Sequence, residues 1–243
     1  MGSAVERMSP TDFAPLWVKH QHFARYAWAA AFARDKIVAD AACGVGYGSN
    51  ILARHGATRV DGYDIAPEAI AEAKAHYPDP RLSFRAADIR QLPIGDHAYD
   101  LFVSFETIEH LEQPSEYLRE VRRVLKPDGV FLCSTPNREV TNPGITIADR
   151  PFNQFHRREY TPSEFVEELR AFFPQVELWG QSPYPRPYVA ALGRLARVRP
   201  MLAVRAHQAR KVCGIPWEHR RYHRVERFTS DSPAEVLVVV CRA

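Results

Sequence analysis

The sequence predicts an α/β protein whose doubly wound, mostly parallel sheet is covered by helices on both faces. Short apolar runs that fit strands alternate along the chain with segments of helical periodicity, which is typical of parallel sheets. A glycine-rich turn follows the first run directly and opens a helix. The first two runs end in acidic residues, Asp40 and Asp64, so both acids are expected at one edge of the sheet.

Seven strands and the helices between them follow from this alternation. A first helix is expected from Phe13 to Arg34, where aromatic residues and alanines recur at helical spacing. The strands are expected at residues 37–40, 59–64, 82–86, 99–105, 130–134, 175–179 and 236–241. Further helices are expected after the glycine-rich turn, at 66–76, at 114–125 and from Thr161, where Thr161, Pro162 and Glu164 fit a capping box with proline at the first helical position.

Two long stretches do not fit the alternation. Residues 138–160 are expected to form a lid-like loop, and residues 181–233 a basic helical insertion before the last strand. The insertion has the pattern of an amphipathic helix that breaks at Pro200. With an N-terminal helical cap at residues 1–35, these segments are assigned to one domain over residues 1–243, because 243 residues are too few for two domains of ordinary size.

The net charge of +3 is unevenly distributed along the chain. Residues 181–230 hold 11 lysines or arginines against two acids, so the remaining residues carry a net charge of −6. Three interpretations of this basic segment stay open: a solvated face or a self-association surface, as in a homodimer; a surface for an anionic substrate; or a nucleic-acid or membrane patch.

Two further patterns limit which classes of protein the sequence fits. No apolar run approaches the roughly 20 residues of a membrane-spanning helix, and the N-terminus lacks a signal-peptide pattern, so a cytoplasmic protein is expected. The cysteines Cys43, Cys133, Cys213 and Cys241 form neither a CxxC pair nor a Cys/His cluster at zinc spacing, so we expect no redox or metal role for them. Three of them lie in apolar or glycine-rich strand regions, where buried thiols are expected.

The turn VADAACGVGYG indicates the ligand. Glycines at 44, 46 and 48 let the backbone approach a ligand closely, and Asp64 can accept hydrogen bonds from both ribose hydroxyls of an adenosine. A dinucleotide is the alternative ligand, but an acid at Asp40, just before the turn, would oppose its phosphates. S-adenosylmethionine (SAM) carries an ammonium and a sulfonium, which acids at Asp40, Asp64 and Asp88 favour. The acids therefore predict SAM as cofactor.

The chain resembles the class I SAM-dependent methyltransferases, in particular the bacterial small-molecule and glycan methyltransferases related to ubiquinone-type enzymes. The resemblance covers about residues 36–179 and rests on DAACGVGYG, GYDIAPEAI, AADIRQLPIGDHAYDLFVSFETIEHL and LKPDGVFLCSTPN. It implies a Rossmann-like fold in which the turn holds the methionine part of SAM, Asp64 the ribose, Asp88 the adenine, and Phe105 and Glu106 flank the sulfonium. The cofactor residues that it implies are Asp40, Ala42, Gly44, Gly46, Tyr47, Asp64, Ile65, Asp88, Ile89, Phe105 and Glu106. Ala42 replaces a glycine common in relatives, a change small enough for binding to survive.

The segment after the fourth strand narrows the acceptor. Its sequence SFET has no NPPY-like tetrapeptide, which disfavours nucleobases and makes nucleic acid an unexpected partner. We therefore expect methylation of a hydroxyl on a sugar, glycan or secondary metabolite. An amine of an amino sugar is the first alternative, and a SAM-binding protein or cyclase without methyl transfer would carry the same cofactor motifs.

Two histidines are the candidates for general base. His110 follows the fourth strand and His156 lies in the lid-like loop, and an imidazole titrates near working pH, although either ring could instead cap a helix or pack. Tyr26, in the first helix, could contact substrate, close over the cofactor together with Arg25, or pack in the core. Candidate substrate contacts that flank the loop are Asn137, Arg138 and Tyr160.

Overall fold

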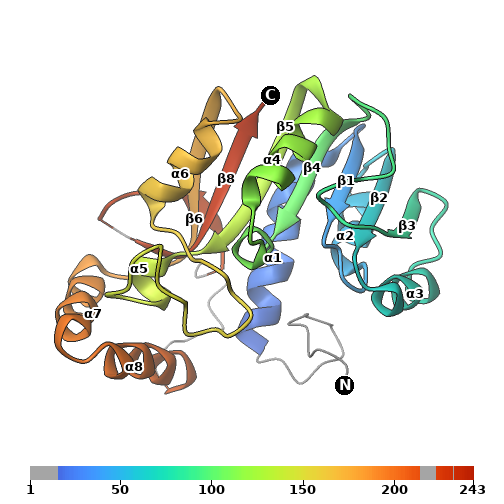
Figure 1. Cartoon of the computed structure of the whole chain (residues 1–243). Helices are drawn as coiled ribbons and strands as arrows, with labels where there is room; N and C mark the ends of the chain where they lie inside the picture. Colours follow the sequence, from blue (N-terminus) through green and yellow to red (C-terminus); the bar gives the residue numbers. More distant parts are fainter. Residues whose placement is uncertain (1–15, 214–222, 232) are drawn as a thin grey trace.

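The computed structural model describes residues 16–213, 223–231 and 233–243 (Figure 1). Its strands are β1 (Ile37–Ala41), β2 (Arg59–Asp64), β3 (Leu82–Ala86), β4 (Tyr99–Phe105), β5 (Leu125–Pro136), β6 (Gln175–Pro183), β7 (Val225–Arg227) and β8 (Ala234–Arg242). Its helices are α1 (Leu16–Ala33), α2 (Tyr47–Arg54), α3 (Pro67–His76), the 3-10 turn η1 (Ile108–His110), α4 (Pro114–Val124), α5 (Arg138–Thr141), α6 (Pro162–Arg170), α7 (Arg186–Val198) and α8 (Pro200–Cys213). Phe13, the expected start of the first helix, lies outside the described residues.

The described strands form one sheet in the order β3-β2-β1-β4-β5-β8-β6-β7. Strands β1 to β5 pair in parallel, whereas β8 runs antiparallel to both β5 and β6. This arrangement confirms the predicted doubly wound, mostly parallel sheet. The strand order reverses between β1 and β4, so a crevice is expected at the carboxyl ends of these two strands.

The described part of the sheet has eight strands, so the predicted number of seven was wrong. The additional strand, β7, lies inside the predicted basic insertion and pairs antiparallel with β6 from Trp179 to Gln181. Its sequence Val-Glu-Arg is too short to show an apolar alternation. The partner strand β6 is also longer than predicted and ends at Pro183 rather than Trp179.

Helices cover both faces of the sheet and enclose two hydrophobic cores. On one face, α4 and α6 contribute Tyr117 and Phe165 to a core with the inward residues of β4, β5 and β8. On the opposite face, α1 and α2 contribute Tyr26 and Leu52. Figure 1 shows α4 and α6 in front of the sheet and α1 behind it. Because α1 covers the strand ends as well as the face, its side chains reach the predicted site.

Local sequence signals for helix ends were accurate. Thr161 and Glu164 form the predicted capping box, and Pro162 lies in the first turn of α6. The amphipathic segment breaks at Pro200, where α7 ends and α8 begins.

The predicted lid and basic insertion pack on each other. Residues 138–141 of the expected loop form the short helix α5, which lies beside α7 and α8 at one corner of the molecule (Figure 1). Gly144 has a positive φ of 89°, and a Cβ atom there would come within 2.7 Å of the Ala196 side chain in α7. Of the helices that the structure describes, none is both long and apolar enough to cross a membrane.

Candidate functional site

The carboxyl ends of β1, β2 and β4 place three of the predicted acids at one edge of the sheet. Asp40 lies in β1, Asp64 ends β2, and Glu106 follows β4. Ala42 and Glu106 have φ values of 57° and 53°, in the left-handed region that side chains with a Cβ rarely adopt. Such strained residues cluster at functional sites, and these two follow the strands between which the sheet order reverses.

The glycine-rich turn has the geometry that its sequence predicts. Gly44 and Gly46 have positive φ values of 54° and 82°. A Cβ atom on Gly46 would come within 2.8 Å of Ala73 and of the Phe84 ring, so only glycine fits there. A Cβ atom on Gly44 would meet nothing within 4 Å, so that turn faces open space.

Asp40 is fully buried and is held by two hydroxyl donors. Tyr26 Oη donates to one carboxylate oxygen at 2.9 Å, and Ser49 Oγ donates to the other at 2.6 Å. Burial raises the pKa of Asp40 to about 6, against the opposing effect of the hydrogen bonds from Ser49 and Tyr26. A cation bound beside Asp40 would offset that desolvation cost.

Asp64 fixes the turn through backbone donors. Its Oδ2 accepts a hydrogen bond from Gly44 N at 2.9 Å, and its Oδ1 accepts one from Ala66 N at 2.9 Å. The carboxylate thus connects the end of β2 to the glycine-rich turn. The next residue, Ile65, is 67% exposed, which is unusual for an isoleucine and leaves its side chain able to cover a ligand.

Asp88 and Ile89 have separate environments. Asp88 forms an ion pair with Arg90 at 2.6 Å, and hydrogen bonds from Arg90 lower the pKa of its carboxyl group. It borders an open hollow that Gln91 and Arg119 also line. Ile89 is buried in the core beneath α4. A ligand at Asp88 would therefore compete with Arg90 for the carboxylate.

Side chains of helix α1 cover Asp40 and the residues around it. The Tyr26 ring contacts the rings of Tyr47 and Phe105 edge-on, with centroid distances of 5.5 and 5.1 Å. Tyr26 also lies so close to Gly48 that a Cβ atom there would come within 2.1 Å of its ring. Tyr47 Oη in turn lies 2.9 Å from His22 Nδ1. Tyr26 therefore lies over Asp40, which fits the alternative that it closes over the cofactor, and its contact with substrate stays a prediction.

Arg25 contributes a buried positive charge between α1 and the strand ends. Its guanidinium lies 3.4 Å from Glu106 Oε1 and 5.8 Å from the centre of the Phe105 ring, and it donates to Gln181 Oε1 at 3.1 Å. Arg25 is 1% exposed, yet its Nε finds no hydrogen-bond partner among the described residues. A buried guanidinium with a donor to spare suits the carboxylate of an amino-acid ligand.

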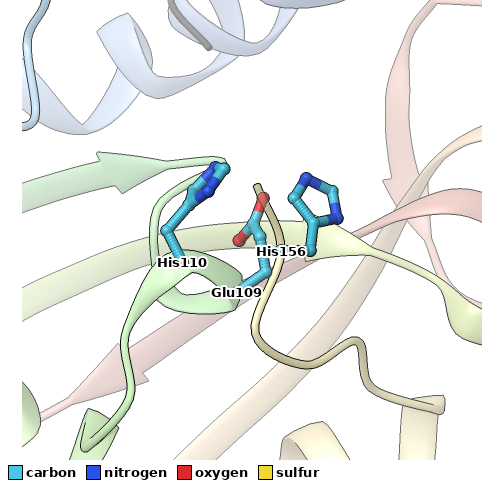
Figure 2. A group of neighbouring side chains, drawn as sticks. All are labelled: Glu109, His110 and His156. Carbon is cyan, nitrogen blue, oxygen red and sulfur yellow. The ribbon is translucent and has the colours of Figure 1, made fainter. Parts of the chain in front are cut away.

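The two candidate bases, His110 and His156, lie together with Glu109 beyond the end of β4. Figure 2 shows Glu109 between the two imidazole rings, whose centroids are 4.9 Å apart. One ligand-type atom from each of the three side chains lies within 4.8 Å of the other two. The structure thus joins residues from η1 with a residue 46 positions further along the chain, in the predicted lid.

Both imidazoles are oriented through Nδ1. His110 Nδ1 donates to the Phe155 carbonyl oxygen at 3.0 Å, and His156 Nδ1 donates to Glu159 Oε1 at 2.7 Å. An Nδ1–H bond places the lone pair of each neutral ring on Nε2. In this structure Asn153 Nδ2 donates to His156 Nε2 at 3.0 Å.

Glu109 has one carboxylate oxygen that accepts a hydrogen bond and one that does not. Its side chain is fully buried, its Oε2 accepts a hydrogen bond from Thr135 Oγ1 at 3.1 Å, and its Oε1 has no hydrogen-bond partner in the described part of the chain. Burial, and next the charge of Glu106, raise the pKa of Glu109 well above its usual value. Such an unpaired buried oxygen is costly unless a ligand reaches it.

The other three predicted substrate residues are engaged in the fold. The Asn137 side chain donates to the Ala234 carbonyl oxygen at 2.8 Å and accepts from Glu139 N at 3.1 Å, which caps α5. Arg138 donates to the Glu159 carbonyl oxygen and forms an ion pair with Glu164 at 2.6 Å. Tyr160 is fully buried in the core. These contacts argue for structural roles, and a substrate contact at these residues stays a prediction.

Three site residues escaped the sequence analysis. Glu159 orients His156 and accepts hydrogen bonds from Thr141 and Asn142, and its spacing of three residues from His156 was a signal that could have been read. Ser49 and Ser134, which donate to Asp40 and Glu106, carry no such signal, because serines in strands and helices are common.

Comparison with known proteins identifies the type of domain. Residues 39–133 match the model of a methyltransferase domain. The probable SAM-dependent methyltransferase of Mycolicibacterium smegmatis is 41% identical over 140 residues, which cover 58% of this chain and 52% of that protein. A probable SAM-dependent methyltransferase of Mycobacterium tuberculosis is 35% identical over 186 residues, covering 76% and 63%. The chain thus spans between about half and three-fifths of the length of these relatives.

A third relative has a more specific name, and the structural neighbours agree on the fold. The ubiquinone biosynthesis O-methyltransferase of Cereibacter sphaeroides is 38% identical over 101 residues, covering 41% of this chain and 40% of that protein. A SAM-dependent methyltransferase from Mesorhizobium loti superposes with a TM-score of 0.61 at 19% identity, covering 92% of this chain and 98% of its own. The [4+2]-cyclase SpnF superposes with a TM-score of 0.60 at 20% identity, covering 91% and 80%.

Proposed function

We propose that this chain, which carries a methyltransferase domain at residues 39–133, is an enzyme that methylates a hydroxyl group of a sugar, glycan or secondary metabolite. One observation carries this proposal: a group of acids suited to a cationic cofactor, Asp40, Asp64 and Glu106, lies at the strand ends near a half-buried histidine, His110, and a buried one, His156. The domain implies SAM as the cofactor, and the relatives bearing that name support methyl transfer.

The residues at the strand ends fit SAM. Asp40 and Glu106 offer carboxylates to the ammonium and sulfonium, and the unpaired Nε of Arg25 suits the carboxylate of the methionine part. Asp64 keeps acceptor lone pairs for ribose hydroxyls beyond those used by Gly44 and Ala66. Bound SAM supplies an electrophilic methyl group on a cationic sulfur.

The chain itself aligns the acceptor and takes up its proton. Tyr26, Tyr47 and Phe105 form an aromatic cover that excludes water from the strand ends, and exclusion of water strengthens the interactions of Asp40. His110 or His156 accepts the hydroxyl proton on Nε2, which in His156 requires that the Asn153 amide first release that nitrogen. We favour His156, because Glu159 stabilises the imidazolium that would form.

The basic corner, formed by helices α7 and α8, favours an acceptor with negative charge. Helices α7 and α8 carry exposed arginines, and they pack on α5, which directly follows β5 at the site edge (Figure 1). A field of one sign near a cleft raises the local concentration of ligands of opposite charge. The named ubiquinone biosynthesis O-methyltransferase supports oxygen rather than nitrogen as the methylated atom.

Two alternatives predict different products. An amine acceptor would give an N-methylated product from the same cofactor site. The [4+2]-cyclase SpnF shares the fold at 20% identity, and its name indicates that this fold also serves cyclisation, for which the product would be a ring and not a methylated acceptor.

The decisive experiment is product analysis. The purified chain is incubated with SAM and a panel of matched hydroxyl and amino acceptors, both neutral and anionic, and S-adenosylhomocysteine is measured by mass spectrometry. We expect S-adenosylhomocysteine with a hydroxyl acceptor and a mass gain of one methylene on that acceptor. Methylation of amino compounds alone would overturn the oxygen assignment, and SAM binding without S-adenosylhomocysteine across the panel would contradict methyl transfer.

A further inference from the structure

The Glu109, His110 and His156 group has a composition that suits a metal ion better than a simple acid–base pair. Two imidazoles and one carboxylate are the ligand set of many catalytic metal sites, which keep open positions for water or substrate. Their ligand atoms lie within 4.8 Å of one another, and they come from η1 and from the predicted lid (Figure 2). From the sequence no metal site is expected, because the cysteines lack the spacing of metal ligands and the three side chains of this group come from separate segments.

We propose that Glu109, His110 and His156 bind one divalent transition-metal ion, such as Mn²⁺ or Zn²⁺, which coordinates the acceptor hydroxyl. The inference rests on the proposed function for the place of the acceptor. The difference from the proposed function is that a metal ion, and not a histidine base, promotes loss of the hydroxyl proton. A hydroxyl bound to the ion loses its proton to water more easily, so the two histidines hold the ion rather than take the proton.

The buried oxygen of Glu109 is the first independent argument. Glu109 Oε1 is fully enclosed, and the described chain provides no hydrogen bond to it, while Thr135 holds only Oε2. A carboxylate in this state is rarely retained in a fold without a ligand. A cation between Oε1 and the imidazoles would satisfy this oxygen.

The orientation of the histidines is the second argument. Metal-binding histidines usually donate their remaining N–H to a carboxylate or a carbonyl oxygen, which fixes the lone pair that faces the ion. His156 donates to Glu159 at 2.7 Å, and His110 donates to the Phe155 carbonyl oxygen at 3.0 Å. Glu159 is itself held by Thr141 and Asn142, so the outer contacts of the site are already formed.

Binding requires small movements only. Ligand atoms at about 2.0–2.1 Å from one ion lie roughly 3.3 Å from one another in tetrahedral geometry. The three side chains must therefore close by about 1.5 Å from their present separation of up to 4.8 Å. Asn153 must also release His156 Nε2, where its amide now occupies the lone pair.

The test measures metal binding on the full chain, freed of metal with EDTA and then saturated with SAM. Titration with Mn²⁺, followed by the electron paramagnetic resonance signal of the unbound ion, should show one ion per chain. Pulsed measurements on the wild-type complex should show coupling to imidazole nitrogen. Zn²⁺ should displace the bound Mn²⁺.

Variants locate the ion. Glu109→Gln, His110→Ala and His156→Ala should each weaken Mn²⁺ binding, and Glu159→Gln should weaken it by about 10-fold to 100-fold through the orientation of His156. His55→Ala is the matched control, because this exposed histidine at the end of α2 forms its ring hydrogen bond with Ile51 of its own helix. Circular dichroism and thermal unfolding establish whether each variant is folded.

Each outcome separates the two proposals. Absence of Mn²⁺ binding at millimolar concentration, or binding without imidazole coupling, overturns the metal site. If methyl transfer then persists in EDTA, the proposed function stands with a histidine as base. Specific Mn²⁺ binding without methyl transfer to any acceptor of the panel supports the metal site and contradicts the proposed function.

Discussion

The two sides of the crevice at the strand ends are built differently. On the cofactor side, Asp40 and Asp64 are satisfied by donors that lie within a few tens of residues, and Asp64 is held by backbone N–H groups. On the acceptor side, Glu109 and His156 meet from segments 47 residues apart, and one oxygen of Glu109 has no partner in the described chain. The cofactor side is therefore preorganised by its own donors, whereas we expect a ligand to complete the proposed acceptor side.

The largest effect is expected on the acceptor side. His156→Ala should lower turnover by about 10²–10⁴ while leaving SAM affinity nearly intact, because the imidazole acts on the acceptor proton, directly or through a bound ion. His110→Ala should act in the same direction. Turnover is measured as S-adenosylhomocysteine formed, and SAM affinity by calorimetry.

His97→Ala provides a control for these histidine variants, because its Nδ1 lies 2.8 Å from the Leu125 carbonyl oxygen, away from the strand ends that carry the site. Full turnover in both His110→Ala and His156→Ala would mean that neither histidine takes part in catalysis. Alignment alone would then drive the reaction.

The second effect concerns the cofactor side. Asp64→Ala should weaken SAM binding by about 1–3 kcal/mol, because two ribose hydroxyls lose a charged acceptor and the turn loses the bonds to Gly44 and Ala66. Calorimetric titration with SAM measures this loss. Asp61→Ala, on the same strand but bound to Tyr99 instead, is the control that tests general damage to β2. Unchanged affinity of Asp64→Ala would move the ribose site elsewhere.

This contrast explains how much the sequence could predict. The acids at the strand ends were predictable, because Asp40 and Asp64 follow apolar runs and a strand end has one place in a doubly wound sheet. The capping box of α6 was predictable for the same local reason. Both signals depend on residues close together in the chain.

The remaining contacts depend on packing between distant segments. The sequence left three roles open for Tyr26, and only the path of α1 shows that its hydroxyl lies on Asp40. Asn137 and Arg138 flank the lid in sequence, yet β5 extends to Pro136 and α5 begins at once, so both side chains turn into the fold. A flanking position gives no information about the direction of a side chain.

The third prediction uses pH on the cofactor side. Asp40 has a pKa raised to about 6 by burial, so its carboxylate becomes protonated as the pH falls through 6. SAM affinity should then fall by up to about tenfold per pH unit between pH 6 and 5, because a cationic ligand loses its partner. Calorimetry at pH 5 to 7 measures this slope, and Asp40→Asn should abolish it.

The stability of the ligand-free protein should move in the opposite direction. A carboxyl group with a folded pKa above its unfolded value favours the protonated form in the native state, so its contribution to stability increases as the pH falls from about 6 towards 4. The difference in unfolding free energy between wild type and Asp40→Asn should follow this trend. A SAM affinity independent of pH would place the ammonium away from Asp40.

The fourth prediction concerns the electrostatic potential that the basic helices α7 and α8 produce at the proposed acceptor side. Glutamine at Arg194, Arg197 and Arg205, all exposed on α7 and α8, should raise the Michaelis constant of an anionic acceptor about threefold to tenfold at low salt. Ionic strength should produce the same rise in wild type, since the Debye length is about 10 Å at 0.1 M salt. SAM affinity should change little.

A matched triple variant tests the position of these charges. Glutamine at Arg34, Arg54 and Arg170 removes the same number of exposed positive charges away from α7 and α8 and should leave the Michaelis constant unchanged. If the first triple variant instead alters sedimentation and leaves acceptor kinetics alone, the basic corner serves self-association. The arginines at 220 and 221, in the same basic segment, lie outside the described residues.

The smallest effect is expected at Ala42, where the preorganised side carries backbone strain. Its φ of 57° costs an alanine about 1–2 kcal/mol relative to glycine, while glycine loses about 0.5–1 kcal/mol more conformational entropy on folding. Ala42→Gly should therefore stabilise the protein by roughly 0.5–1 kcal/mol, as measured by urea unfolding. Ala191→Gly, on the exposed face of α7, should have the opposite sign and destabilise by about 1 kcal/mol. If both glycine variants destabilise equally, the turn holds Ala42 without strain, and the cofactor side is more relaxed than its backbone angles indicate.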